Sequence, residues 1–358
     1  MTKTKISIII PIYNGLPYLY ECLDSIVAQR SVNMEVLLIN NGSTDDTLKV
    51  CRNYAKDHSF IKVYDISICS IGGARNFGLA HSTGEYIMFI DADDFLPDSL
   101  VLHDMLRKSM AKSSDICVGN FSRLWGDKLL HATSHRTFSK YPQNGNRFLF
   151  TGFFSVDILS YVWAKLFKKS FIMNNGLRFA DCRYAEDKLF TLQCSAKNAV
   201  YSFINREVYV HRNNPDSVSN SYRIHSHLIW LDIARNIKDT FKDEGFIPPM
   251  WERITAYTIF FGCFFDCKME YLHFGRKTSG VVRLLKQYAI DPLAASCFKL
   301  LSHPSGIKGT PSRVYRVFIS VFAFCMRFHL YHLVSFGIKL LVELKIDEML
   351  SDTGRKPS

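Results

Sequence analysis

Three carboxylates directly follow an apolar run that is typical of a buried strand. The run is Tyr86–Ile90, and the carboxylates are Asp91, Asp93 and Asp94. Ligands of open α/β sheets bind where the strands end, so a substrate is expected beside these acids. Asp-x-Asp supplies the oxygen ligands that Mg²⁺ and Mn²⁺ prefer, and such an ion can bridge the phosphates of a substrate. One acidic cluster alone is explained equally well by a solvated turn.

A second acidic pair, Glu186 and Asp187, stands at the start of a predicted helix. Carboxylates in the first turn of a helix complement its dipole, which explains the pair without any chemistry. A partly buried carboxylate can instead act as a general base near neutral pH, because burial raises its pKa. The pair by itself favours the helix-dipole interpretation.

The elements that would position these acids alternate between strand and helix. Apolar runs predict strands at Ile6–Ile12, Glu35–Ile39, Ile61–Tyr64 and Tyr86–Ile90, and the intervening segments predict helices at 17–29, 44–56 and 72–81. Ser43 or Thr44 is expected to cap the second of these helices. Alternation at this spacing predicts βαβ units and a Rossmann-like, mainly parallel sheet flanked by helices. Its strand ends would gather Asn14, Asn41, Arg75 and Asp91 at one edge.

The rest of the chain is predicted to extend this sheet and then to become helical. Further elements are expected at 98–112 (helix), 115–118 (strand), 161–172 (helix), 184–190 (start of a helix), 200–203 and 207–211 (two strands). Residues 123–150 are polar and are expected to form a loop or hairpin region near the site. We expect two domains, an α/β domain over residues 1–219 and a basic, mainly α-helical domain over residues 220–358.

Composition is that of a globular protein with anionic partners. The chain has 358 residues, 47% of them hydrophobic, and a formal net charge of +11, which favours nucleotide or phospholipid partners. The ten cysteines are scattered singly, a pattern that predicts reduced, buried thiols in the cytosol. The N-terminus enters a strand at once and shows no signal-peptide pattern. Neither Gly-x-Gly-x-x-Gly nor Gly-x-x-x-x-Gly-Lys-Ser/Thr occurs, which disfavours dinucleotide-binding and P-loop proteins.

Six motifs in order give the sequence a family resemblance. They are Pro11-Ile12-Tyr13-Asn14, Asn40-Asn41-Gly42-Ser43-Thr44-Asp45, Ala74-Arg75-Asn76, Gly84-Glu85-Tyr86, Asp91-Ala92-Asp93-Asp94 and Glu186-Asp187. One such motif is weak evidence, but six in order are specific. Over residues 5–219 the chain resembles a family 2 glycosyltransferase with the GT-A fold, of the bacterial type that builds surface polysaccharides.

The resemblance implies inverting transfer of a sugar from a nucleotide sugar, with Mn²⁺ or Mg²⁺. It assigns the metal to Asp93, with His211 as a second candidate ligand. The family usually has Asp where this chain has Asn41, but an amide still accepts a hydrogen bond from uracil N3–H. UDP is therefore the expected nucleotide. The donor-binding residues implied are Pro11, Tyr13, Asn14, Asn41, Arg75, Asp91, Ala92 and Arg212.

The resemblance implies that the second acidic pair, Glu186 and Asp187, is catalytic. Asp187 is expected to be the base that takes the proton of the acceptor hydroxyl, and Glu186 is expected to orient base or acceptor. Trp163, Lys165 and Asp94 occupy positions that resemble the acceptor side. Ser217 and Ser219 lie in a loop that would fold over the donor. A buried structural role explains His211 equally well, and an aromatic residue such as Trp163 on an amphipathic helix more often belongs to the core.

The C-terminal segment 313–345 is apolar and basic. From Lys268 to Ser358 there are 14 Lys and Arg against 6 Asp and Glu. The apolar run Val317–Met326 is shorter than the roughly twenty residues that a membrane-spanning helix needs. A basic helix with Phe, Tyr and Leu can lie in the lipid interface, although it can equally pack on a protein core. We expect a cytoplasmic protein, peripheral on the inner face of the cell membrane, with a glycan or glycolipid acceptor.

Two other functions compete with this interpretation. A sugar nucleotidyltransferase also uses an α/β sheet with Asp-bound metal, but it needs a Gly-rich basic loop after the first strand, which Pro11–Gly15 does not supply. A non-catalytic nucleotide-sugar or membrane-binding module would lack the metal ligand or the base, whereas Asp93 and Asp187 are both present. Nucleic acid is not expected as a partner, because no recognition motif accompanies the basic region.

Overall fold

The computed structural model describes residues 4–67, 70–181, 185–214, 225–310 and 312–345, without the side chains of residues 131–133 and 244. The chain divides into two units, one formed mainly by residues 1–139 and 158–215 and the other by residues 140–157 and 216–355. The segment 140–157 thus groups with the helical part of the chain, although it precedes residue 219. Each unit is described separately below.

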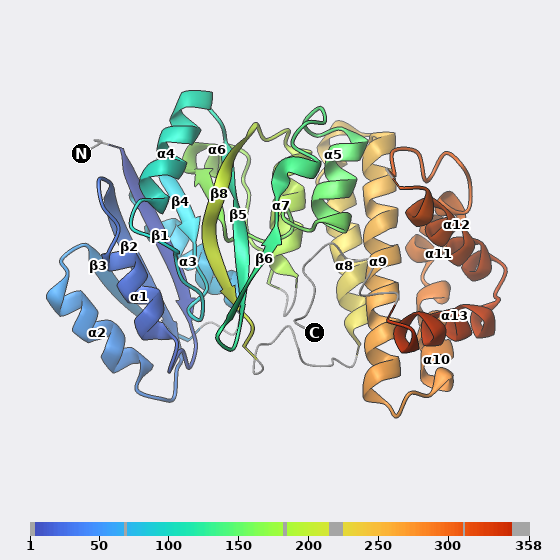
Figure 1. Ribbon diagram of the computed structural model, residues 1–358. Coiled ribbons are helices and arrows are strands. Elements are labelled where there is room, and N and C mark those ends of the chain that lie inside the picture. The colour runs from blue at the N-terminus through green and yellow to red at the C-terminus, as the bar shows by residue number, and fades with distance from the viewer. Residues whose placement is uncertain (1–3, 68–69, 182–184, 215–224, 311, 346–358) are drawn as a thin grey trace. The chain divides into compact units, whose positions relative to one another are not determined.

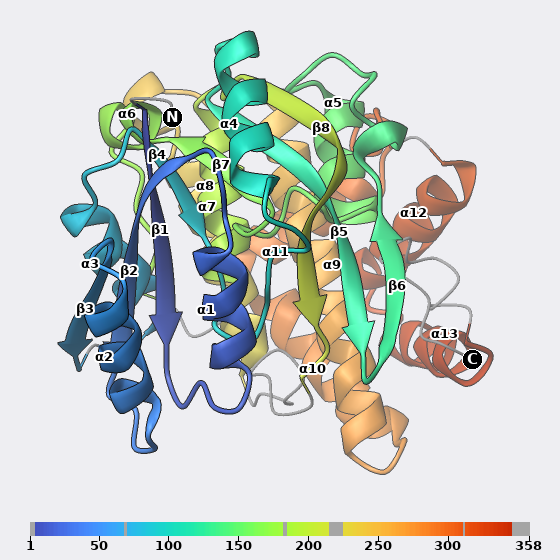
Figure 2. The same ribbon diagram turned by 60° about the vertical axis from the view of Figure 1, so that its left-hand side comes forward.

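The first unit contains a mixed sheet with helices on both faces (Figures 1 and 2). Its strands are β1 (Lys5–Ile12), β2 (Asn33–Asn41), β3 (Ile61–Ile66), β4 (Tyr86–Phe89), β5 (Ile116–Trp125), β6 (Lys128–Thr133), β7 (Lys165–Lys168) and β8 (Tyr201–Arg212). Its helices are α1 (Leu19–Val27), α2 (Thr47–Asp57), α3 (Ile71–His81), α4 (Val101–Lys112), α6 (Lys169–Asn174) and α7 (Glu186–Ala196). The described strands run in the order β3-β2-β1-β4-β7-β5-β6, and β8 also pairs with β5.

Most of these strands point the same way. β1 pairs in parallel with β2 and β4, β2 with β3, and β5 with β8, whereas β7 and β6 are antiparallel to their neighbours. The expected α/β class with a mainly parallel sheet is therefore confirmed. Because β1, β2, β4 and β8 end on the same side, the loops that follow them meet at one edge of the sheet.

A buried carboxylate fixes the opposite edge of the sheet. Glu35 of β2 accepts hydrogen bonds from the Ser7 hydroxyl (2.6 Å) and the Thr83 backbone amide (2.6 Å), and it pairs with Lys5 and Lys62 (3.1 Å each). Burial alone would raise the pKa of Glu35, but the hydrogen bonds from Ser7, Thr83 and Lys62 outweigh burial and hold the pKa well below its usual range. The cluster ties β1, β2 and the turn before β4 together.

Two glycines allow close packing around β1. A Cβ on Gly84 would lie 2.7 Å from the Ser7 backbone nitrogen, and a Cβ on Gly78 of α3 would lie 2.4 Å from Cγ2 of Ile9. Larger side chains at either position would push α3 or the β4 turn away from the sheet. The glycine of the Gly84-Glu85-Tyr86 motif is therefore explained by packing.

The second unit is helical and is built around one long helix. α9 (Pro249–His273) packs against α8 (Ser226–Asp239), α10 (Thr278–Ile290), α11 (Pro292–Leu301) and α13 (Tyr331–Glu343). α12 (Arg313–Arg327) packs mainly on α11, and α5 (Asn146–Phe150) continues into a π-helical turn over residues 151–155. The expected helical C-terminal region is confirmed. None of the helices that the structure describes is long and apolar enough to cross a membrane.

Several predicted elements differ from the structure. The helix expected at 161–172 is instead the short strand β7 followed by α6, and the two strands expected at 200–211 are one strand, β8. The second helix begins at Thr47, because Ser43 and Thr44 bond to Asn14 rather than capping the helix. Residues 123–133 form the hairpin of β5 and β6. The eight cysteines within the described residues are buried and free.

Candidate active site

The acidic loop after β4 is held in place by β8. The buried Asp94 carboxylate accepts a hydrogen bond from the Arg212 backbone amide (2.8 Å) and lies 3.3 Å from Nδ1 of His211. The Asp91 amide donates to the Tyr209 hydroxyl (3.1 Å). Burial would lower the pKa of His211, but the Asp94 carboxylate outweighs burial and raises it. Asp94 therefore shapes the loop from inside the protein and does not face an acceptor.

Of the three acids in this loop, Asp93 is the candidate for binding a ligand. It is half-buried, and its side chain accepts a hydrogen bond from the Asn214 amide (3.2 Å). Burial and the neighbouring carboxylates of Asp94 and Asp91 raise the pKa of Asp93 to about 6. A divalent ion bound at Asp93 would favour the charged form of its carboxylate.

The donor set around Asp93 fits a metal that the substrate helps to hold. No group of three or more metal-ligating side chains occurs within the described ranges. Mg²⁺, and Mn²⁺ with it, is commonly held by one or two carboxylates together with substrate phosphates. Asp93 satisfies this pattern, whereas Nδ1 of the second candidate, His211, lies beside Asp94. The metal role of both residues remains a prediction.

Arg75 joins the two acidic groups that the sequence singled out. Its guanidinium donates to Asp91 Oδ1 (2.8 Å) through Nη2 and to Glu186 Oε1 (2.6 Å) through Nη1. The side chain is 2% exposed, and its Cζ lies 5.4 Å from the centre of the Phe179 ring. The acidic loop after β4 and the start of α7 are therefore neighbours, although they are almost a hundred residues apart in sequence. The expected contact of Arg75 with the donor remains a prediction beside this bridge.

Replacing Arg75 with Met is expected to lower the free energy of unfolding by about 3–5 kcal/mol, because the buried Glu186 and the half-buried Asp91 would lose their cation. Arg75→Lys keeps the charge and should cost less, although it cannot bond both acids with the same geometry. Urea unfolding followed by circular dichroism measures both variants. A variant Arg75→Met with unchanged stability but weakened nucleotide-sugar binding would instead support the donor contact that the sequence suggested.

The base candidate lies at the strained start of α7. Ala185, the residue before the helix, has a φ of +57°, which is unusual for a residue with a Cβ. Burial and the Glu186 carboxylate raise the pKa of Asp187 to about 7, against the lowering effect of Arg75. Asp187 Oδ1 accepts from the Lys188 amide (2.7 Å), and Oδ2 has no hydrogen-bond partner among the described residues. These are properties that a general base needs near neutral pH.

Close packing holds α3 against this acidic pair. A Cβ on Gly72 would lie 2.6 Å from the Ala180 carbonyl oxygen and 3.5 Å from Cγ of Glu186. The Asn76 amide donates to the Phe179 carbonyl (2.8 Å) and accepts from the Phe179 amide (3.0 Å). The Ala-Arg-Asn motif thus provides a bridge at Arg75 and a clamp at Asn76, both directed to the segment that leads into α7.

The residues predicted to hold the nucleotide lie at the ends of β1 and β2. Asn14, whose φ is +49°, donates through its backbone amide to the Ser43 hydroxyl (3.0 Å), and its side-chain oxygen accepts from the Thr44 amide (2.8 Å). Tyr13 is 64% exposed, and Asn41 is half-buried. Pro11 is buried within β1, and Ala92 is half-buried beside Asp91. Base and ribose contacts by these residues remain predictions.

Arg212 connects the acidic loop to α1. Its Nε donates to the Asp93 carbonyl (3.0 Å), its Nη2 pairs with Glu21, and its Cζ lies 4.7 Å from the centre of the Tyr18 ring. The guanidinium is therefore beside Asp93, as a diphosphate contact requires. Glu21 is the group that a phosphate would have to displace or share.

Trp163 and Lys165 lie in the interior instead of on an acceptor surface. Trp163 is 4% exposed and stacks with Tyr161, Tyr209 and His211 at ring-centre distances of 4.3, 4.9 and 5.2 Å. The buried Lys165 ammonium donates to the carbonyls of Ile158 and Tyr161. Both side chains thus support the wall beneath the acidic loop. Ser217 and Ser219 lie outside the described residues.

Three residues that position the site were not assigned a role from the sequence. Tyr209 supports Asp91 from β8, Asn214 bonds to Asp93, and Asn76 clamps Phe179. Alternation along β8 is the available signal for Tyr209, because it points to the same face as His211 two residues later. Asn214 gave no signal apart from its place in a polar turn.

Known proteins share both the sequence pattern and the fold. The Glycosyl transferase family 2 model matches residues 7–171. The uncharacterized glycosyltransferase EpsJ of Bacillus subtilis is 27% identical over 60% of this chain and 62% of its own length. The cholesterol galactosyltransferase of Borreliella burgdorferi is 28% identical over 62% of this chain and 64% of its own length. The chain thus spans less than two thirds of the length of these relatives.

The structural comparison extends over nearly the whole chain. The structure of S. aureus TarS 1–349 in complex with UDP-GlcNAc has a TM-score of 0.67 and 17% sequence identity, and it covers 95% of this chain and 92% of that one. A structural similarity at 17% sequence identity shows only that the fold is shared. The family match identifies residues 7–171 as a family 2 glycosyltransferase domain, and the structural likeness shows the GT-A fold of such enzymes.

Proposed function

We propose that this protein transfers a hexose or N-acetylhexosamine from a UDP-sugar to a hydroxyl of a glycan, with inversion at the anomeric carbon. The acceptor would be a lipid-linked or lipopolysaccharide-type glycan, such as a growing O-antigen or capsule chain. The observation that best supports the proposal is the Arg75 bridge, which joins Asp91 of the acidic loop to Glu186, the neighbour of Asp187, whose pKa is raised to about 7.

The chemistry requires one in-line displacement. The acceptor oxygen forms a bond to the anomeric carbon while the bond from that carbon to the diphosphate oxygen breaks, and the electron pair leaves with UDP. Asp187 accepts the proton of the attacking hydroxyl. Asp93 would hold Mn²⁺ or Mg²⁺ on the diphosphate, with His211 as the second candidate ligand. When bound, this ion offsets the negative charge that develops on the leaving group.

The remaining residues bind and orient. Arg75 keeps Asp91 and Glu186 in position and, through its charge, keeps the pKa of Asp187 from rising further. Asn14 and Asn41 would contact the nucleoside, and Arg212 the diphosphate. The basic C-terminal region supports a peripheral position on the cytoplasmic face of the membrane, where a lipid-linked acceptor would be available.

Turnover of nucleotide sugars tests the proposed reaction. The protein is incubated with UDP, GDP, dTDP and CMP sugars and Mn²⁺, and the released nucleotide is measured. We expect slow release of UDP from one UDP-sugar, because water can replace the acceptor. In a separate incubation with a nucleoside triphosphate and a sugar 1-phosphate, release of pyrophosphate would instead indicate a nucleotidyltransferase.

A further inference from the structure

An apolar stripe runs along the exposed side of α12. Val314, Val317, Val321, Phe324 and Phe328 are 60%, 63%, 56%, 49% and 51% exposed. Their spacing of three and four residues places them on one face of the helix. The opposite face, with Ile319, Phe322 and Met326, is buried, so α12 is apolar on both its inner and its outer side. A helix that needs only its inner face for folding has no structural use for the outer one.

The same pattern continues on α13, which packs against α12. Leu333, Phe336, Leu340 and Leu344 are 57%, 52%, 40% and 63% exposed and recur at intervals of three and four residues. Leu330, in the turn between the helices, is 43% exposed. We call these nine residues and Leu330 the α12–α13 stripe; Phe328 and Leu344 directly follow the last residues of α12 and α13. Exposed apolar groups that recur along one face of each of two packed helices favour an interaction site.

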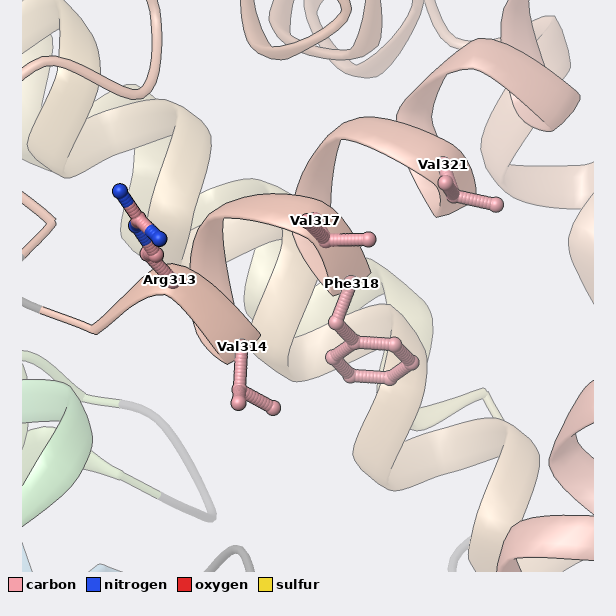
Figure 3. Close-up of a pocket in the computed structure, with 5 residues that line it drawn as sticks. All are labelled: Arg313, Val314, Val317, Phe318 and Val321. Carbon is pink, nitrogen blue, oxygen red and sulfur yellow. The ribbon is translucent and has the colours of Figure 1, made fainter.

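A shallow depression of about 530 Å³ lies along the first half of the stripe. It is lined by Arg313, Val314, Val317, Phe318 and Val321, which all belong to α12 (Figure 3). Because one helix supplies the entire lining, the depression is open along its length. Such a surface suits a broad apolar layer better than a small molecule, which needs walls on several sides.

The charges beside the stripe identify the kind of partner. At 3.6 residues per turn, Arg313, Arg316 and Arg327 fall on one flank of the α12 stripe, between it and the buried face. From Arg313 to Lys345 there are five Lys and Arg, and Glu343 is the acid of this segment. Glu343 accepts a hydrogen bond from Tyr271 (2.6 Å). An apolar face with a cationic border matches an anionic lipid surface, in which acyl chains lie beneath phosphate groups.

We propose that the α12–α13 stripe docks this protein on an anionic phospholipid surface, with both helices lying in the plane of the interface. The helices, of 15 and 13 residues, are too short to span a bilayer, which agrees with an in-plane position. A second copy of the chain is the alternative occupant, but it would bring the same arginines against these arginines. The proposal rests on the lipid-linked acceptor proposed above and names the surface that reaches it.

Vesicle flotation with the full chain tests the docking surface. Vesicles of phosphatidylcholine with phosphatidylglycerol are compared with vesicles of phosphatidylcholine alone, without nucleotide or acceptor. We expect binding to the anionic vesicles, and about tenfold weaker binding for the double variant Val317→Ser, Phe324→Ser, which removes two apolar anchors. Arg313→Gln with Arg316→Gln should lose the preference for anionic vesicles. The matched control is Leu228→Ser with Phe246→Ser, which removes two side chains of similar exposure elsewhere in the helical unit.

Three outcomes would overturn the proposal. The first is that the wild type does not bind anionic vesicles. The second is that the stripe variant and the Leu228, Phe246 control lose vesicle binding equally. The third is that the wild type is a dimer, which the stripe substitutions dissociate without changing vesicle binding. The last outcome would assign the stripe to a second copy. Circular dichroism and UDP-sugar binding by each variant confirm that the fold is intact. Since vesicle binding is measured without substrate, its failure is distinguishable from failure of the proposed reaction.

Discussion

Asp187→Asn is expected to lower the rate of UDP release at saturating UDP-sugar by about a thousandfold, because a positioned general base typically contributes between about a hundredfold and ten-thousandfold. The amide has nearly the same shape but cannot take a proton from the attacking hydroxyl. Binding of the UDP-sugar should be unchanged, since Asp187 acts on the acceptor side. The measurement is kcat from released UDP, together with calorimetric titration of the donor.

The pH dependence of kcat in the wild-type protein should report the ionisation of Asp187. Only the ionised carboxylate accepts a proton, so kcat should fall as the pH falls through about 7, the raised pKa of Asp187. One pH unit below this value the rate should be about tenfold lower. Asp181→Asn, an exposed acid six residues before Asp187, is the matched control and should keep both rate and profile. A wild-type rate that is constant from pH 5 to 8 would exclude Asp187 as the base.

Asp93→Asn is expected to lower kcat/KM for the UDP-sugar by about a hundredfold or more, because charge on the leaving diphosphate would lose several kcal/mol of stabilisation. The substitution should also raise the free energy of unfolding in the absence of divalent metal. Burial and the Asp94 and Asp91 carboxylates disfavour the charge of Asp93 in the folded protein, as its raised pKa of about 6 indicates. A carboxyl group whose pKa is higher in the folded than in the unfolded protein destabilises the folded state once the pH exceeds its pKa in the unfolded protein.

These opposite effects distinguish a functional role of Asp93 from a structural one. Loss of activity in a protein that is more resistant to urea cannot come from misfolding. Asp98→Asn, on the same loop and exposed, is the matched control for the charge change and should leave turnover unchanged. If Asp93→Asn retained full turnover with Mn²⁺, the assignment of the metal to this loop would be wrong.

The sequence predicted the first half of the sheet well because its local signals agreed. β1 to β4 are apolar runs separated by helices with suitable turns, and the parallel pairing follows from that alternation. β7 was predicted as part of a helix, since Lys165 and Lys168 make a short segment appear amphipathic. Tertiary pairing with β4 and β5 decides its structure, and such pairing leaves no local pattern.

The motifs located the site, but not the contacts within it. Asp93 and Asp187 were assigned their roles through the family resemblance, and these roles remain predictions. The resemblance also implied that Arg75 contacts the donor. Its actual partners, Asp91 and Glu186, are 16 and 111 residues away, and no single-sequence pattern reveals which acids a buried cation will meet. The same holds for Lys165, whose partners are backbone carbonyls.

Calorimetric titration with a UDP-sugar tests the central claim most directly, because it requires no acceptor. The claim is that the loop after β4 binds a nucleotide sugar together with a divalent ion, next to a separate base. We predict that wild type and Asp187→Asn bind the UDP-sugar alike in the presence of Mn²⁺, and that EDTA or Asp93→Asn weakens binding at least about tenfold. Absence of metal-dependent binding of any nucleotide sugar by the wild type would contradict the account.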